Sequence, residues 1–186
     1  MFGGGTALKH KFNHRESKDI DIFFTNPQFL NSVSPRINDG VEANLIDYSE
    51  LAHHIRLHFQ EGEIDFIVSP PITQIKPELT LVLDSIVNMD HPVEIVAKKI
   101  YHRADTFKPR DVFDLAVVYN AYSDAMLRNA KAFAQKLPVL AKRIDVIEHS
   151  GELEKWLSVL TILSGGEKIR GREVELCRQF IHAAGS

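Results

Sequence analysis

Residues 4–24, GGTALKHKFNHRESKDIDIFF, contain the main sequence features that predict the fold and the chemistry of this chain. Its glycine pair and threonine predict a turn that opens a short helix over residues 6–12. A polar loop follows, and the apolar and acidic run after it predicts a strand over residues 18–24. Because strand side chains alternate between the two faces of a sheet, Asp19 and Asp21 are expected to share one face.

The two aspartates and the glycine pair supply the two halves of a nucleotide site. Two carboxylates held side by side are costly unless a positive charge lies between them. Hard cations such as Mg2+ take oxygen ligands, commonly one or two carboxylates together with substrate phosphates, and Mn2+ is an alternative. Upstream, Gly4 and Gly5 let backbone N–H groups approach a phosphate, whose charge is favoured at a helix N-terminus. The stretch therefore predicts a site for a nucleoside triphosphate and a divalent cation.

This order of glycine turn, loop and acid–hydrophobic–acid strand has the form of the nucleotidyltransferase-fold signature. From residue 3 to about residue 122, the chain resembles the AbiEii family, the toxin half of abortive-infection toxin–antitoxin pairs that act in phage defence. Four blocks carry the resemblance: GGTAL with HRESKDIDIFF, EIDF at residues 63–66, KIYHR at residues 99–103, and RDVFD at residues 110–114. A lone Asp-x-Asp occurs by chance in many acidic chains, whereas four ordered blocks are specific.

The resemblance implies an α+β fold, a nucleotidyltransferase-like mixed sheet with flanking helices followed by a C-terminal helical bundle. It implies a nucleotidyltransferase core over residues 1–122 and a C-terminal helical region over residues 123–186. That fold usually has a strand before the glycine turn, but only Met1 and Phe2 precede Gly3. We therefore expect either that the start is truncated or that the protein does without this strand. A missing strand is expected to expose an unpaired sheet edge or an uncovered apolar face, which invites self-association or a partner protein and lowers stability.

The composition suits one domain with an appendage and excludes several classes of protein. A chain of 186 residues can bury a core, and its formal charge of −3 creates no global basic field for nucleic acid. Cys177 is the one cysteine, so an internal disulfide is excluded and a reducing cytoplasm is expected. No apolar run could span a bilayer, and no signal-peptide pattern is present.

A predicted β-hairpin brings a third acid to the first two. Apolar and polar residues alternate over residues 55–59, which predicts a half-buried strand, and a polar turn leads into a second strand over residues 63–68. Asp65 on this second strand can face the same site as Asp19 and Asp21. A helix start capped by Asn26 with Pro27 first and a strand with its exit over residues 79–89 are also predicted. Later helices are predicted from residues 92 and 109, two more from about residue 123, and closing helices over residues 153–163 and 174–184.

The helix predicted after Pro92 carries the clearest candidate cation. Its apolar residues recur at helical spacing and define a buried stripe made of Val93, Val96, Ala97 and Ile100. At about 100° per residue, Lys99 and Arg103 lie together on one border of that stripe, whereas Lys98 projects toward solvent. This geometry selects Lys99, and the Lys-x-x-x-Arg spacing of the resembled family selects it as well.

The resemblance assigns roles to the residues of the four blocks. The expected metal ligands are Asp19, Asp21 and Asp65, and the expected catalytic residues are Asp65, Lys99 and Asp114. The expected nucleotide-binding residues are Gly4, Gly5, Thr6, Arg15, Ser17, Lys99, Arg103 and Arg110. Asp65 is expected to activate the acceptor hydroxyl, Lys99 and Arg103 to hold the triphosphate or pyrophosphate, and Asp114 to act catalytically or structurally.

Some of these residues could instead have a purely structural role. Arg110 and Asp114 are i, i+4 neighbours on a helix and could form a simple salt bridge of about 0.3 kcal/mol. Asp111 lies where an acid stabilises a helix N-terminus, and Ser17 could merely cap the turn before the strand. Zinc binding is disfavoured, since no cysteine or third ligand is suitably spaced from the clustered histidines His10, His14, His53, His54 and His58.

The resemblance implies metal-dependent transfer of a nucleoside monophosphate to RNA, with the tRNA 3′ end as the leading acceptor and a cognate antitoxin as restraint. The near-neutral charge gives RNA no independent support. Two rivals remain: transfer to a protein or to a small-molecule hydroxyl such as that of an antibiotic, and a nucleotide-binding module without activity. The intact acids and Lys99 argue against the inactive module.

Overall fold

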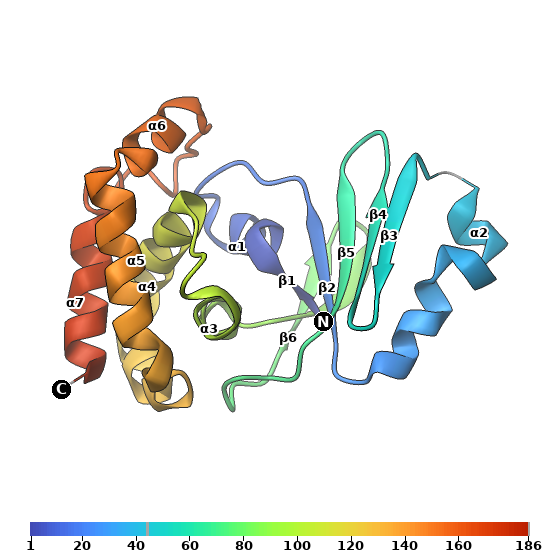
Figure 1. Cartoon of the computed structure of the whole chain (residues 1–186), viewed down its shortest axis with the longest axis horizontal. Coiled ribbons are helices and arrows are strands. Elements are labelled where there is room, and N and C mark those ends of the chain that lie inside the picture. Colours follow the sequence, from blue (N-terminus) through green and yellow to red (C-terminus); the bar gives the residue numbers. More distant parts are fainter. Residues whose placement is uncertain (44, 186) are drawn as a thin grey trace. The chain divides into compact units, whose positions relative to one another are not determined.

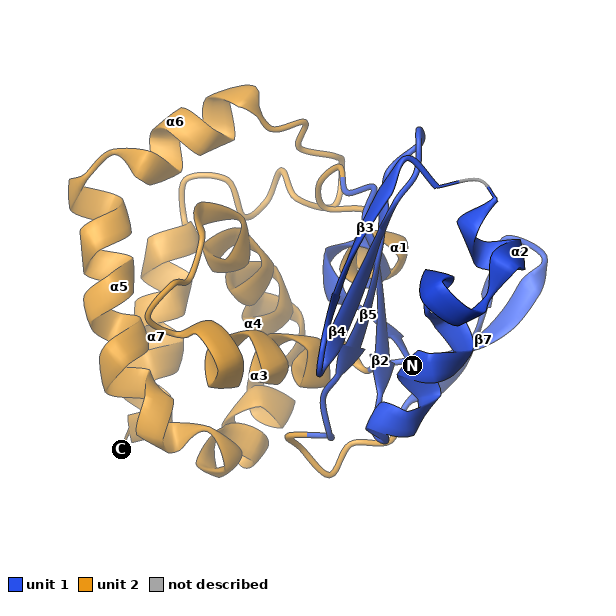
Figure 2. Cartoon of the chain, turned by 45° about the vertical axis from the view of Figure 1, so that its right-hand side comes forward, with its two compact units in different colours: residues 1–7, 17–71, 77–90 blue, residues 8–16, 72–76, 91–186 orange. Residues whose placement is uncertain are grey.

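The computed structural model describes residues 1–43 and 45–185, which form two compact units, each built from several chain segments. The first unit comprises residues 1–7, 17–71 and 77–90, and the second comprises residues 8–16, 72–76 and 91–186 (Figure 1, Figure 2). Helix α1 (Gly4–Phe12) begins in the first unit and ends in the second. The predicted division at residue 122 groups residues by function rather than by compactness, and it stays a prediction.

The first unit is a seven-stranded mixed sheet in the order β3-β4-β5-β2-β1-β7-β6. Its strands are β1 (Phe2–Gly3), β2 (Ile20–Phe24), β3 (Asp47–Leu51), β4 (His54–His58), β5 (Glu63–Val68), β6 (Glu78–Val82) and β7 (Ser85–Met89). Strand β2 runs parallel to β5, and β1 runs parallel to β7, while the other neighbours are antiparallel. With the helices of the second unit, this mixed sheet confirms the predicted α+β class.

The first residues form an inner strand of the sheet instead of an edge. Phe2 pairs with Ile22 of β2 on one side and with Met89 of β7 on the other. The expectation of an unpaired edge at this place was therefore wrong, because two residues are enough to join β2 to β7. The other expected consequence was an uncovered apolar face, and large apolar side chains are exposed on the β6–β7 hairpin at Leu79, Leu81, Leu83 and Ile86. Self-association stays a prediction.

The predicted hairpin is confirmed as β4 and β5, closed by a hydrogen bond from the Phe59 amide to the Gly62 carbonyl at 2.9 Å. Its apolar residues Ile55 and Leu57 are buried together with Leu30. Leu30 comes from a 3-10 helix, η1 (Pro27–Val33), which Asn26 caps by accepting from the Gln28 amide. Two shorter helices follow, η2 (Pro35–Ile37) and α2 (Asp39–Glu42), and β6 with β7 forms a second hairpin.

The second unit is helical and buries most of the large apolar side chains of the chain. Its helices are α3 (Pro92–Arg103), α4 (Pro109–Asn129), η3 (Ala130–Ala132), η4 (Ala134–Lys136), α5 (Leu137–His149), α6 (Glu152–Val159) and α7 (Glu173–Gly185) (Figure 1). The predicted stripe of α3 is confirmed, since all four of its residues are fully buried. No helix of the residues described is both long and apolar enough to cross a membrane.

Two helices differ from the prediction in their bounds. The helix expected from residue 123 is the second half of α4, which continues past a break at Tyr122 with φ −135° and ψ 39°. The helix expected over residues 153–163 ends at Val159, because Leu160 is extended and Ile162 forms a β-bridge with Arg15. Long-range pairing therefore overrides the local helical pattern at this point.

Candidate active site

Three strands of the first unit place two acids and one arginine in a row. Asp21 of β2 is the register partner of Asp65 of β5, and Asp65 is the register partner of Arg56 of β4. Partners in adjacent strands project to the same face of a sheet, so the two carboxylates and the guanidinium are neighbours. The prediction that Asp65 faces the same way as Asp21 is confirmed. Asp19 lies one residue before β2 begins.

Arg56 and His54 hold the carboxylate of Asp65. Oδ1 accepts from Arg56 Nε at 2.8 Å and from His54 Nε2 at 2.6 Å, while Oδ2 accepts from Arg56 Nη2 at 3.0 Å. Burial opposes ionisation of Asp65 and is the largest single influence. The hydrogen bonds and charges of Arg56 and His54 together outweigh it, so the pKa of Asp65 lies below its ordinary value.

The start of helix α1 is shaped around Asp21. Gly4 has a φ of +70°, and a Cβ on it would lie 1.7 Å from Oδ2 of Asp21. Only glycine leaves room for the carboxylate at this backbone position. Next along the helix come Gly5 and then Thr6, whose hydroxyl bonds the Ser17 hydroxyl at 3.0 Å and the Asp19 carbonyl. These bonds tie the helix start to the loop that leads into β2.

The donor chemistry at this place fits a hard divalent cation. Asp19 and Asp21 offer carboxylate oxygens, the ligands that Mg2+ prefers, and Gly4 leaves the space that Asp21 needs. Asp65 fits less well as a ligand, because Oδ1 already accepts two hydrogen bonds and Oδ2 one. Within the described residues, no group of three His, Cys, Asp or Glu side chains is arranged to hold a metal ion. The metal site at Asp19, Asp21 and Asp65 stays a prediction.

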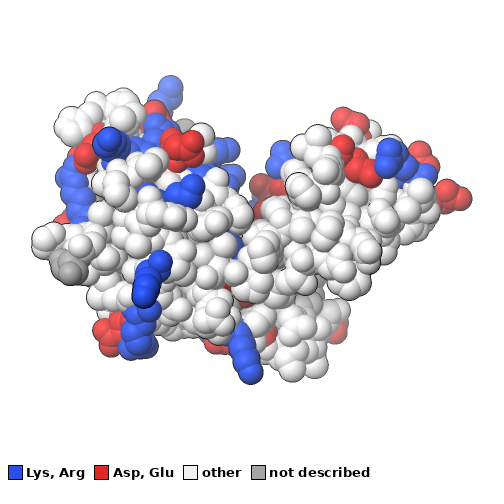
Figure 3. Space-filling model, turned by 60° about the horizontal axis from the view of Figure 1, so that its bottom comes forward, with Lys and Arg blue, Asp and Glu red and all other residues white. Residues whose placement is uncertain are grey.

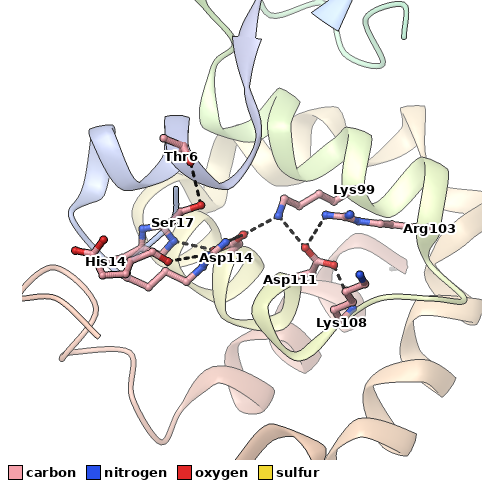
Figure 4. A network of polar contacts seen from close by, with 10 residues as sticks. Thr6, His14, Ser17, Lys99, Arg103, Lys108, Asp111 and Asp114 are labelled. Carbon is pink, nitrogen blue, oxygen red and sulfur yellow. Dashed lines mark hydrogen bonds and ion pairs between the residues drawn. The ribbon is translucent and has the colours of Figure 1, made fainter. Parts of the chain in front are cut away.

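In the second unit, Asp114 is the centre of a buried ion cluster (Figure 4). Its Oδ1 accepts from Arg15 Nε at 2.7 Å and from His14 Nε2 at 2.8 Å. Its Oδ2 accepts from Arg15 Nη2 and Lys99 Nζ, both at 2.7 Å. Because a carboxylate only accepts, His14 carries its hydrogen on Nε2, and its buried Nδ1 has no partner among the described residues.

Asp111 extends the cluster toward the start of α4. Lys99 Nζ donates to its Oδ1 at 2.8 Å, and Arg103 Nη2 donates to the same oxygen at 2.7 Å. Oδ2 accepts from the backbone amide of Lys108 at 3.1 Å, which is the helix-start role expected for Asp111. The cluster thus holds two buried carboxylates against the guanidinium and ammonium groups of Lys99, Arg103 and Arg15.

Both acids of this cluster have a lowered pKa. Burial is the largest influence on each and would raise the pKa, but the surrounding cations outweigh it. For Asp111 these are Lys99 and Arg103, and for Asp114 they are Lys99 and Arg15. The pKa of Asp114 lies well below its usual range, so its proton affinity is too low for an efficient base.

Two sequence predictions about charged residues of α3 and α4 are wrong. Lys98 does not project toward solvent: its side chain is 4% exposed and its Nζ lies 3.8 Å from Glu94 Oε1. Glu94 in turn accepts from the backbone amides of Ile72 and Thr73, so the segment Ile72–Lys76 covers this second face of α3. The simple pairing of Arg110 with Asp114 is also wrong, since Asp114 is paired with Arg15, Lys99 and His14.

Arg15 was expected at the triphosphate, but the structure ties its guanidinium to Asp114 and, through Nη1, to the Glu16 carbonyl. Its phosphate contact stays a prediction. No local pattern predicts the hydrogen bonds of His14 and His54 to the two acids. Arg56 alternates with buried Ile55 and Leu57, which marks it as facing away from the apolar side, and this was the one available signal.

Charge on the molecular surface is mixed. The face in Figure 3 carries Lys and Arg side chains interspersed with Asp and Glu, between large uncharged areas. This agrees with the near-neutral composition and marks no broad basic field on that face.

Comparisons with known proteins add the following. One family model matches residues 1–157, and it describes "Nucleotidyl transferase AbiEii toxin, Type IV TA system". One similar solved structure is "Crystal structure of putative nucleotidyltransferase from H. pylori", 17% identical, with a TM-score of 0.48 over all of this chain and 87% of that chain. That likeness is too distant to carry any conclusion. No curated protein matches the chain.

Proposed function

Because this chain belongs to the AbiEii family of nucleotidyltransferase toxins of type IV toxin–antitoxin systems, we propose that it transfers a nucleoside monophosphate from a nucleoside triphosphate to RNA. The tRNA 3′ end is the favoured acceptor, and its modification would stop translation. The observation that carries the proposal is the register of Asp21 with Asp65, beside the helix start where Gly4 makes room for Asp21. The family also implies a cognate antitoxin, and we expect action in the cytoplasm, where nucleotide and RNA are available.

Asp19 and Asp21 would hold Mg2+ or Mn2+ in this proposal. When bound, the cation supplies charge neutralisation at the phosphate oxygens and at the leaving pyrophosphate. Thr6, Ser17 and the backbone at Gly4 and Gly5 fix the place of the two acids relative to the helix start. Their N–H and hydroxyl groups are the proposed contacts of the triphosphate.

Lys99 and Arg103 are the proposed phosphate-binding cations, together with Arg110. The ammonium of Lys99 uses two of its three donors on Asp111 and Asp114, which orient the third toward a ligand. Arg103 is 33% exposed, uses Nη2 on Asp111 and buries its Nε, so Nη1 is the nitrogen proposed to reach a phosphate oxygen. A charge-assisted contact of this kind contributes about 1.5–3 kcal/mol.

Asp65 is the proposed acceptor of the proton from the attacking hydroxyl. Its Oδ2 accepts a single hydrogen bond, so one lone pair remains for the incoming group. Asp114 is proposed as a positioning residue, because both of its oxygens are occupied by four donors and its pKa lies well below the usual range. It orients Lys99 without touching the substrate.

A labelling experiment tests the proposal. The purified chain is incubated with each of the four α-labelled nucleoside triphosphates, Mg2+, and either total RNA, a protein lysate stripped of RNA, or a panel of aminoglycosides. We expect label in the tRNA fraction, sensitive to removal of the terminal nucleotides and absent with Asp21→Asn. Label confined to protein or to the small molecules would favour the first rival. Nucleotide binding without transfer to any acceptor would favour the inactive module.

A further inference from the structure

The carboxylate of Asp65 has a protein counter-charge built into its own sheet. Asp65 is 7% exposed, and its register partner on β4 is Arg56, whose guanidinium meets it through two separate nitrogen atoms. His54, two residues earlier on the same strand, adds a third hydrogen bond at 2.6 Å. Arg56 also lies 3.5 Å from Glu63 at the start of β5, so it faces a second acid more loosely.

The neighbour on the other side of Asp65 is a second acid. Asp21 is its register partner on β2, so two carboxylates project from adjacent strands to the same face. Like charges directly opposite each other on a sheet are destabilising. Two adjacent carboxylates are commonly stabilised by a cation bound between them. Here Arg56 stands on the far side of Asp65 and balances its charge without any bound ion.

We infer that Arg56, and not a metal ion, is the counter-charge of Asp65, so that the divalent cation is held by Asp19 and Asp21 alone. Arg56 is then a positioning residue: it turns Oδ1 of Asp65 toward itself and His54 and leaves a lone pair on Oδ2. This inference rests on the proposed function for the cation at Asp19 and Asp21, but the pair of Arg56 with Asp65 does not depend on it.

A double-mutant cycle in metal-free buffer tests the pair itself. Arg56→Gln and Asp65→Asn are each expected to lower the melting temperature by about 4 °C, since either leaves a partly buried charge without its partner. The double variant should lose clearly less melting temperature than the sum of the two single losses. Arg36→Gln removes a guanidinium that is 67% exposed and 3.0 Å from Glu50, and serves as the surface control. Additive losses at Arg56 and Asp65 would overturn the inference.

Binding of Mn2+ alone, measured by electron paramagnetic resonance or calorimetry, tests the ligand set. Asp65→Asn by itself decides nothing, because it leaves Arg56 unbalanced and would repel a cation under either scheme. The double variant Arg56→Gln with Asp65→Asn keeps the net charge of the wild type. We expect its Mn2+ affinity to stay within about threefold of wild type. Asp21→Asn should lose at least about tenfold, since even outer-shell changes cost about 10–100-fold.

Arg56→Gln alone should bind Mn2+ more tightly than wild type, because it removes a positive charge that acts on Asp65 and also on Asp19. A purely structural role of Arg56 would weaken binding instead. If the double variant loses as much affinity as Asp21→Asn, then Asp65 is a metal ligand and the inference is wrong. If wild type binds no Mn2+, the metal dependence in the proposed function fails, and the melting cycle still decides whether Arg56 and Asp65 are paired.

Discussion

Arg15 and Asp114 form a buried bidentate ion pair in the second unit. Arg15 Nε donates to Oδ1 and Nη2 donates to Oδ2, both at 2.7 Å. The exposed fraction of the arginine side chain is 4% and that of the aspartate is 0%. Bidentate pairing of this kind fixes the orientation of both side chains as well as their distance. The pair therefore connects the loop after α1 to the middle of α4 and sets the place of Lys99.

The first prediction removes the centre of this cluster. Asp114→Asn leaves Arg15 buried without its counter-charge and leaves Lys99 with Asp111 alone, and we expect it to lower the free energy of unfolding by about 3–5 kcal/mol. Urea unfolding followed by circular dichroism measures the change. Asp124→Asn, on an exposed position of the same helix, is the control and should unfold close to wild type. Equal midpoints for the two variants would show that the cluster adds no stability.

The second prediction concerns acid. The folded pKa of Asp111 and that of Asp114 lie below the ordinary value, so both acids stabilise the fold wherever they are ionised in the unfolded chain. This stabilisation is complete above the unfolded pKa of about 3.9 and is lost as pH falls below it, toward the folded values. Urea midpoints between pH 7 and pH 3 should stay level down to about pH 5 and then drop.

The same titration in Asp114→Asn provides the comparison. The difference in urea midpoint between this variant and wild type should be constant at neutral pH. It should become smaller below about pH 4, where Asp114 of the unfolded wild type is protonated. A gap that widens in acid would mean that the sign of the pKa shift is wrong.

The third prediction separates the two adjacent lysines. Lys99→Ala removes the ammonium that Asp111 and Asp114 orient, and we expect the KM for nucleoside triphosphate to rise about tenfold or more. Lys98→Ala removes the nearby positive charge of buried Glu94 and should lower the melting temperature while changing that KM little. Steady-state transfer assays and thermal melts on both variants separate binding from stability. A similar rise in KM for both would contradict the division of roles.

The burial of Lys98 could not be predicted from the periodicity of its own helix. The apolar stripe of α3 was predicted correctly from its spacing, and with it the place of Lys99 at the border. The prediction from 100° per residue assumed a single buried face of the helix, whereas all residues from Pro92 to Ile100 are buried. The second cover comes from the segment Ile72–Lys76, anchored by two backbone amides on Glu94, and no local pattern reports such a contact.

The same limit applies to the partners of the acids. Alternation along β2 and β5 predicted the strands and the shared face of Asp21 with Asp65, since that depends on short-range periodicity. His14 lies 100 residues from Asp114 along the chain, in a stretch that reads only as a polar loop. Its burial is a product of tertiary packing, and a single sequence contains no periodic trace of it.

The fourth prediction tests the acid beside Gly4 directly. Asp21→Asn keeps the size of the side chain and removes one charge, so the fold should persist. We expect transfer to fall about a hundredfold or more, because the lost charge-stabilisation of the transition state is worth several kcal/mol. Asp84→Asn, exposed in the turn between β6 and β7, is the matched control. Transfer by Asp21→Asn at the wild-type rate would remove this strand from the reaction.

The fifth prediction compares two glycines that share a left-handed backbone and differ in their surroundings. Gly4 has φ +70° and Gly171 has φ +80°, but a Cβ at Gly4 would lie 1.7 Å from Asp21 Oδ2, whereas nothing lies within 4 Å at Gly171. Gly171→Ala should therefore cost only the backbone strain of about 1–2 kcal/mol and leave Mn2+ affinity and transfer unchanged. Gly4→Ala carries the same strain and must also push the carboxylate of Asp21 aside. We expect it to melt below Gly171→Ala and to lose Mn2+ affinity and transfer as Asp21→Asn does, measured by thermal melts, Mn2+ titration and labelling. If the two alanine variants instead behave alike in all three measurements, the close approach of Asp21 to the start of α1 has no part in binding or catalysis.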